Sequence, residues 1–246
     1  MMPHSSNAIL SRISPVDFED LRPRLRLLEL PRGKVLARSR ECINQVYFPH
    51  GGILSSVVEL EDGTAVESGM IGKDGVFGAA AAIDSRLSLH KVMVQAPSYA
   101  TAVDADHLRA VAQSSSEFLA LLMKYEQFFL AQVQQTAACN ALHTIEQRMC
   151  KWLVRMHDLV GDELPLTQEF MAQMMGVRRT SVSAAAAQMQ KQGLISYHRG
   201  KVRILSIDHV QRRACECQQT VRDHYAELFG PTGKTGPADR TGQQLI

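Results

Sequence analysis

The spacing of apolar positions changes near residue 115 and divides the chain into two kinds of structure. Before it, short β-branched and aromatic runs at 46–48, 53–60 and 91–94 alternate with turn residues. Asp62-Gly63 lies between two apolar runs and is a strong hairpin signal. Many short strands at near-regular spacing predict an antiparallel barrel or roll. A short helix over 104–113 follows it.

From residue 116 to 142 the apolar residues recur at helical spacing, with no Pro or Gly among them. Five of them are four, three, four and four residues apart: Phe118, Leu122, Tyr125, Phe129 and Val133. Ser116 is a suitable N-cap. Such a helix spans roughly 40 Å and outruns a small domain's core. We therefore predict that the five residues form the seam of a symmetric dimer. The alternative is a helix packed wholly against its own barrel.

The segment 164–205 predicts a helix-turn-helix followed by a hairpin. Thr167 is a good N-cap for a helix ending at Met175, and Gly176 supplies a tight turn. A second helix over 179–192 completes the pattern. Residues 194–205 then favour strand, turn and strand, and a second amphipathic helix over 144–159 precedes the whole segment.

The side chains in this segment are those that contact bases and phosphates. The start of the second helix carries Arg178, Arg179, Thr180, Ser181 and Ser183. Arginine can bond two guanine acceptors at once, and the first turns of a recognition helix point into the major groove. Arg199 and Lys201 lie at the hairpin turn, where a basic wing meets phosphate. The alternative is that all these charges form an ordinary solvated surface.

The distribution of charge agrees with a phosphate-facing module. Residues 143–213 carry 11 basic and 6 acidic side chains (11 − 6 = +5), whereas residues 1–142 carry 13 and 15 (13 − 15 = −2). No apolar run approaches the roughly 20 residues of a membrane span, and the N-terminus lacks a secretion signal. The cysteines are odd in number and scattered: Cys42, Cys139, Cys150, Cys215 and Cys217. We therefore expect a cytoplasmic protein without a disulfide framework.

The motifs L-T-Q-E, G-V-R-R-T-S-V-S and G-L-I-S-Y-x-R-G-K-V-R-I, together with the earlier turn pattern M-I-G…G-V-F-G, closely resemble the Crp/Fnr family of bacterial regulators. The resemblance implies an α+β chain: an antiparallel, cyclic-nucleotide-binding-like β-roll (1–115), a dimerisation helix (116–142), a winged helix-turn-helix (143–213), and a C-terminal helix with a disordered tail (214–246). It also implies a homodimeric transcription regulator that binds a near-palindromic operator on double-stranded DNA and contacts RNA polymerase. We expect no enzyme activity.

By resemblance Arg179 reads bases, and Thr167 and Gln168 lie near phosphate. Thr180 and Ala184 stand where well-known members carry glutamate and a polar or basic residue. Neither can accept from cytosine as a carboxylate does, so we expect a different operator sequence. The competing function is a small-molecule or redox-sensing module whose main partner is a ligand or protein.

The sequence argues against cyclic AMP in its usual pose. Cyclic-nucleotide-binding members hold the ribose with Gly-Glu and the phosphate with an arginine. Here Ala79 and His90 replace that glutamate and arginine, and neighbouring Lys91 lacks the arginine fork. Haem stays open, with His90, His107 and His143 as candidate ligands.

We predict no metal site. An iron–sulfur cluster needs about four thiolates, and Cys215 and Cys217, two apart on an expected helix, would face different ways. Redox sensing through Cys139 or Cys150 stays open, beside the simpler interpretation of buried helix thiols. The glycine-rich stretch 230–235 lacks the spacing and context of a phosphate-binding loop.

Overall fold

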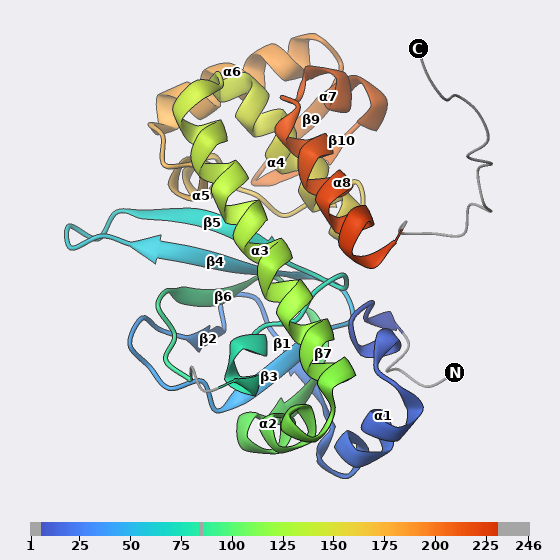
Figure 1. Ribbon diagram of the computed structural model, residues 1–246. Helices are drawn as coiled ribbons and strands as arrows, with labels where there is room; N and C mark the ends of the chain where they lie inside the picture. The colour runs from blue at the N-terminus through green and yellow to red at the C-terminus, as the bar shows by residue number, and fades with distance from the viewer. Residues whose placement is uncertain (1–5, 84–85, 231–246) are drawn as a thin grey trace, which may run out of the picture.

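The structure, a computed structural model, describes residues 6–83 and 86–230 and has the α+β architecture that the sequence predicts (Figure 1). A β-roll occupies one end, a helical module with a small sheet occupies the other, and one long helix runs past both (Figure 1). Within the described ranges, no helix is both long and apolar enough to cross a membrane.

Seven strands form two antiparallel sheets in the N-terminal half, in the orders β1-β7-β3 and β2-β6-β4-β5. Their bounds are Arg26–Leu30 (β1), Val35–Ala37 (β2), Gln45–Pro49 (β3), Ile53–Glu59 (β4), Ala65–Ile71 (β5), Lys91–Ala96 (β6) and Ser98–Asp104 (β7). The expected hairpin joins β4 to β5. In its turn, Asp62 Oδ1 accepts the Thr64 N–H at 2.8 Å, and Gly63 adopts a φ of 82°.

Short helices close the roll. They are η2 (Leu10–Arg12), α1 (Pro15–Leu21), η3 (Arg22–Arg24), η4 (Ala79–Ala82) and α2 (Ala105–Ser114). The Asp104 side chain caps α2 by accepting the N–H groups of Asp106 and His107. Most of the buried apolar residues of these helices, the strands and the long helix form one continuous core, while part of β4, β5 and β6 packs into the core of the C-terminal module.

The long helix α3 spans Ser116–Leu142 as expected, but its N-cap is Ser115, whose hydroxyl accepts the Phe118 N–H at 3.2 Å. The prediction that its largest apolar side chains form a dimer seam is wrong for Phe118, Leu122 and Tyr125. These three are at most 2% exposed and belong to the core of their own roll. The helix lies across that roll, and burying large apolar side chains within the chain is strongly favourable. Phe129 packs partly against the same core, and Val133 is half-buried.

The side of α3 away from the roll is exposed. Six of its exposed residues, spaced by seven, three, four, three and four, form an uncharged row beside the exposed Lys124: Ala120, Gln127, Leu130, Gln134, Ala137 and Ala141. We call this row the outer face of α3. Its spacing is that of a coiled-coil seam, and Leu130 is 57% exposed.

The C-terminal module begins with α4 (Ile145–Val160), and Thr144 and Gln147 form a capping box at its start. The helices that follow are α5 (Gln168–Met175), α6 (Arg179–Lys191) and α7 (Ile207–Arg213). A three-stranded antiparallel sheet has the order β8-β10-β9, with bounds Glu163–Leu164 (β8), Ile195–His198 (β9) and Lys201–Ile204 (β10). Helix, turn, helix and hairpin therefore follow in the predicted order.

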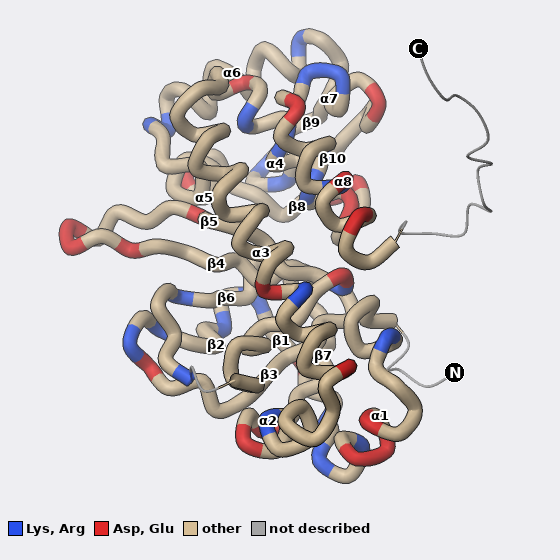
Figure 2. Tube along the Cα trace, viewed as in Figure 1, with Lys and Arg blue, Asp and Glu red and all other residues tan. Residues whose placement is uncertain are grey.

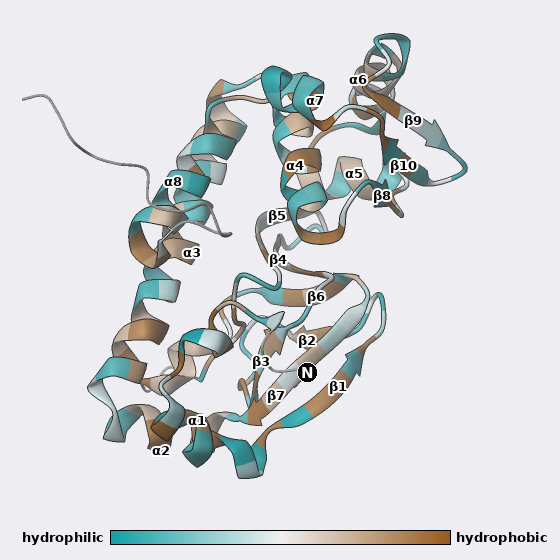
Figure 3. Cartoon of the chain, turned by 90° about the vertical axis from the view of Figure 1, so that its right-hand side faces the viewer, coloured by the Kyte–Doolittle hydropathy of each residue, from teal (hydrophilic) through white to brown (hydrophobic). Residues whose placement is uncertain are grey.

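A last helix, α8 (Cys217–Phe229), runs back beside α3 (Figures 1 and 3). The Tyr225 hydroxyl donates to the Asp74 carbonyl at 3.1 Å, and Arg222 pairs with Asp158 of α4 at 2.8 Å. Helix α8 thereby contacts both the roll and the C-terminal module. The expected disordered tail and most of the glycine-rich stretch 230–235 lie outside the described residues.

Candidate nucleic-acid interface

The turn between α5 and α6 is fixed by local chemistry. The Thr167 hydroxyl accepts the Phe170 N–H at 3.1 Å and caps α5. Gly176 ends that helix with a φ of 61°, a conformation that other residues rarely adopt. On α6, Val182, Ala186 and Met189 are fully buried, so the opposite side of this helix faces outward.

The N-terminal end of α6 presents two arginines to solvent. Arg178, Arg179 and Thr180 are exposed, and Ser181 is half-buried. Arg179 Nε lies 3.7 Å from a Glu169 carboxylate oxygen, with the arginine side chain 67% exposed. An exposed pair of this kind contributes little stability. The guanidinium is therefore free to exchange its partner for a base edge or a phosphate.

Two other predicted DNA contacts also hold the motif together. The Ser183 hydroxyl donates to Gln168 Oε1 at 2.6 Å and joins α6 to α5. The backbone N–H of Gln168 donates to the Tyr197 hydroxyl at 3.2 Å, and the Tyr197 N–H donates to Gln190 Oε1 at 2.8 Å. Sequence analysis missed Tyr197, which links the start of α5, the end of α6 and strand β9. In the sequence, Tyr197 is only one residue of an expected strand, and nothing in its spacing predicts these bonds.

The β9–β10 hairpin turns through two residues of positive φ, Arg199 at 45° and Gly200 at 77°. Such a pair marks the type I′ turn that suits a two-residue hairpin. Arg199 and Lys201 are both exposed there. The hairpin projects beside α6 at the side of the molecule away from α3 and α8 (Figure 3), and basic positions recur over the module that contains it (Figure 2). The described geometry thus brings a basic helix end and a basic hairpin tip into one module.

Residues 147–213 match the family model of Crp-like helix-turn-helix domains. Solved structures resemble about three quarters of the chain. FixK2 from Bradyrhizobium japonicum is 15% identical, with a TM-score of 0.67 and coverage of 78% of this chain and 98% of that one. A CRP-family transcriptional regulator from Thermus thermophilus is 17% identical, with a TM-score of 0.64 and coverage of 76% and 96%.

The c-di-GMP-responsive global regulator CLP from Xanthomonas campestris is 15% identical, with a TM-score of 0.62 and coverage of 78% and 100%. The chain has the Crp/Fnr fold. The resemblance drawn from the sequence motifs is confirmed, and the Crp-like helix-turn-helix supports DNA binding and transcription regulation. Curated protein sequences give no match to the chain.

In this Crp/Fnr-fold chain, the β-roll and α3 line a small, partly open cavity of about 180 Å³, with His90, Glu126 and mostly apolar side chains in its wall. Pockets for ligands of drug size are larger, roughly 300–1,000 Å³. The Glu126 carboxylate accepts the Ala80 N–H at 3.1 Å, and neighbouring Ala79 is fully buried. Burial raises the pKa of Glu126 and lowers the pKa of His90. Glu126 therefore occupies the backbone N–H next to Ala79, and the absence of cyclic AMP stays a prediction.

The roll meets the helix-turn-helix module through buried polar contacts. Glu67 of β5 is 6% exposed; it accepts the Trp152 indole N–H of α4 at 2.7 Å and the Ser55 hydroxyl at 2.6 Å. Burial raises the pKa of Glu67 to about 7, against smaller opposing effects of these bonds and of two nearby cations. Beside it, Arg155 pairs with Asp74 at 2.7 Å. No periodic pattern in the sequence pointed to these contacts.

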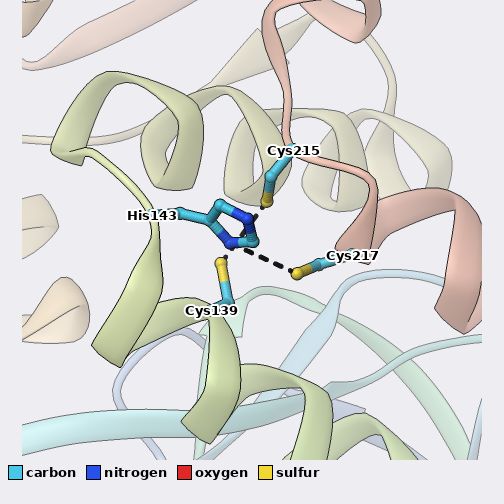
Figure 4. Close-up of side chains that lie close together, drawn as sticks. All are labelled: Cys139, His143, Cys215 and Cys217. Atoms are coloured by element: carbon cyan, nitrogen blue, oxygen red, sulfur yellow. Dashed lines mark hydrogen bonds between the residues drawn. The ribbon is translucent and has the colours of Figure 1, made fainter.

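One cluster of ligand-type side chains bears on the prediction that the chain has no metal site. The ligand-type atoms of Cys139, His143, Cys215 and Cys217 all lie within 4.8 Å of one another (Figure 4). The sequence pattern predicted that Cys215 and Cys217 lie on one helix and face different ways. In the structure, Cys215 precedes α8, which begins at Cys217, and both thiols point toward Cys139 and His143. His143, proposed above for haem, therefore lies among thiols. Of the other haem candidates, His90 lines the small cavity, and His107 Nε2 lies 3.0 Å from the Asp20 carbonyl.

Proposed function

We propose that the chain is a sequence-specific transcription regulator that binds a near-palindromic operator as a homodimer. The observation that carries this proposal is the exposed, basic N-terminal end of α6 beside the basic tip of the β9–β10 hairpin, within a Crp-like helix-turn-helix domain. We further propose that the protein acts in the cytoplasm and contacts RNA polymerase from its operator.

In the proposed complex, each α6 enters a major groove by its N-terminal end, and the two half-sites lie about 34 Å apart, one helical turn of DNA. Arg179 exchanges Glu169 for a guanine edge, which offers two acceptors to its guanidinium. Arg199 and Lys201 at the hairpin tip meet phosphate, and Thr167 lies near the backbone. Thr180 contacts bases differently from the glutamate of well-known members.

We expect Arg179→Ala to weaken binding to the preferred operator by about 1–3 kcal/mol and to relax base preference at one position. Lys201→Ala should weaken binding to all sequences alike and lower the salt dependence by about one phosphate contact. Selection from random DNA supplies the operator, and fluorescence anisotropy at several salt concentrations measures both effects.

The matched control is Arg24→Ala, because Arg24 is an exposed arginine on the β-roll, far from α6 in the fold. It should leave affinity and salt slope unchanged. Unaltered affinity in both Arg179→Ala and Lys201→Ala would overturn the proposed interface and favour a module whose main partner is a ligand or protein.

The proposed homodimer uses the outer face of α3 rather than the side chains buried in the roll. Alanines and glutamines at coiled-coil spacing let two helices approach closely, and Leu130 supplies a large apolar contact. A symmetric pairing of this face places two α6 helices on one side of the dimer, as a palindromic operator requires.

Leu130→Glu should raise the dimer dissociation constant at least about tenfold, because it removes the one large apolar contact of the seam and places a carboxylate opposite its own copy. Sedimentation equilibrium measures this constant. Leu27→Glu is the control, since Leu27 is 49% exposed on β1 and away from α3. A wild-type chain that stays monomeric at micromolar concentration would refute the dimer, and a Leu130→Glu variant that dimerises like wild type would refute this face.

A further inference from the structure

Three of the five cysteines meet one histidine at the junction between α3 and the helix-turn-helix module (Figure 4). Cys139 comes from the last turns of α3 and His143 from the turn before α4, while Cys215 lies between α7 and α8 and Cys217 is the first residue of α8. The three thiols are 1–4% exposed and form an apolar cluster of their own. Segments more than 70 residues apart in the chain therefore bring four soft or borderline donor atoms together.

Two of the six separations between these atoms match a single tetrahedral ion, and the others are at most 4.8 Å. Cys139 Sγ lies 3.4 Å from Cys215 Sγ, and Cys217 Sγ lies 3.5 Å from His143 Nδ1. Zinc–sulfur bonds of about 2.3 Å in a tetrahedron place two sulfurs about 3.8 Å apart, and a sulfur and an imidazole nitrogen slightly closer. An iron–sulfur cluster spreads its thiolates further, because irons and sulfides lie between them. The two thiols are also well beyond the roughly 2.05 Å of a disulfide.

The groups around the four donors support the same assignment. His143 directs Nδ1 toward the thiols, while its Nε2 lies 3.3 Å from a carboxylate oxygen of Glu216. Metal-binding histidines commonly donate their second ring N–H to a carboxylate in this way. Gln135 Nε2 donates to Cys217 Sγ at 3.1 Å, which suits a sulfur that carries negative charge.

We propose that Cys139, His143, Cys215 and Cys217 form a tetrahedral site for one zinc-class divalent ion, with Glu216 orienting the imidazole. Three thiolates and a neutral imidazole give a closed site without a water position, which is typical of structural rather than catalytic zinc. The complex carries a net charge of −1, and the cationic side chains of Lys151 and Arg148 lie near enough to the thiols to interact with them.

The position of this site indicates what the ion does. His143 directly precedes the helix-turn-helix module and Cys215 directly follows it, while Cys139 belongs to α3. One ion therefore fastens both ends of the DNA-binding module to the end of the long helix. Loss of the ion removes one link between the α7–α8 segment and α3, so the ion adds to the contacts of α4 and α8 that hold the module, with α6, against the rest of the chain.

The first test measures metal content. The full chain, purified under reducing conditions without chelator, should contain about one zinc per chain by mass spectrometry of the elements. Cys215→Ser and Cys217→Ser should each lower this ratio at least about tenfold. Cys42→Ser and Cys150→Ser are matched controls, because Cys42 is exposed, Cys150 is buried elsewhere in the module, and neither joins the cluster. They should keep a full complement of zinc.

A second measurement needs no substitution and so does not depend on how the variants fold. Wild-type protein stripped of metal should bind one Co²⁺ with the visible absorption of tetrahedral cobalt and a sulfur-to-metal charge-transfer band.

A third test uses Glu216→Gln, a change at an exposed position, which should raise the metal dissociation constant about tenfold or more. A chain that binds neither ion when reduced, that holds iron with labile sulfide or haem instead, or that shows a Cys139–Cys215 disulfide in the reducing preparation would overturn the proposal. None of these outcomes depends on whether the protein binds DNA.

Discussion

Replacing Arg155 with methionine should lower the free energy of unfolding by about 3–5 kcal/mol. Arg155 of α4 holds Asp74 of the β-roll with two bonds, of 2.7 and 3.2 Å, and the side chains are only 14% and 18% exposed. The variant leaves the Asp74 carboxylate largely buried without its partner, and that desolvated charge is costly. Chemical denaturation at pH 7 measures the loss.

Two further variants show whether the pair itself causes this loss. Arg22→Met removes an arginine whose pair with Glu19 is 59% and 63% exposed, and it should cost less than about 1 kcal/mol. Adding Asp74→Asn to Arg155→Met should restore part of the stability, because it removes the stranded charge. If Arg155→Met and Arg22→Met lower the free energy of unfolding equally, the buried pair contributes no more stability than an exposed one.

Local signals in the sequence were enough for most of the fold. Thr167 and Asp62-Gly63 each determine a structure within a few residues, so the helix-turn-helix and the β4–β5 hairpin were predictable. Arg179 was placed correctly on an exposed helix end for the same reason. Its contact with DNA stays a prediction, because nothing within the chain tests it.

Features that depend on distant contacts were not predictable. Both faces of α3 have helical spacing, and only the roll decides that Phe118 and Tyr125 point inward while Leu130 stays exposed. The cysteine cluster was missed because α8 begins at Cys217, so Cys215 is not on that helix. In the sequence, Glu67 and Arg155 are indistinguishable from other charged residues. Their bonds to Trp152 and Asp74 form only because the fold brings β5 and the turn after it against α4.

Because of the buried Glu67, the free energy of unfolding should fall as the pH rises from about 4.5 to about 7. Its pKa is raised from 4.5 to about 7 in the folded chain, chiefly by burial, so across this window the folded state keeps a proton that the unfolded state releases. The stabilising contribution is therefore complete below pH 4.5 and is lost by about pH 7, a change of about 3 kcal/mol. Nearby Lys151 and Arg155 favour the ionised form and keep the shift from being larger.

Glu67→Gln should abolish this part of the pH dependence, because glutamine stays neutral and its carbonyl can still accept the Trp152 indole N–H. Relative to wild type, the variant should gain up to about 3 kcal/mol between pH 5 and pH 8, measured by denaturant unfolding at both values. Glu59→Gln is the matched control, since Glu59 is 46% exposed in its pair with Lys91 and lies on the neighbouring strand. Because the Glu67–Trp152 bond joins β5 to α4, the stability lost at high pH is lost at the junction between the roll and the helix-turn-helix module. Parallel pH profiles for wild type and Glu67→Gln would mean that Glu67 is already ionised in the folded chain at pH 5.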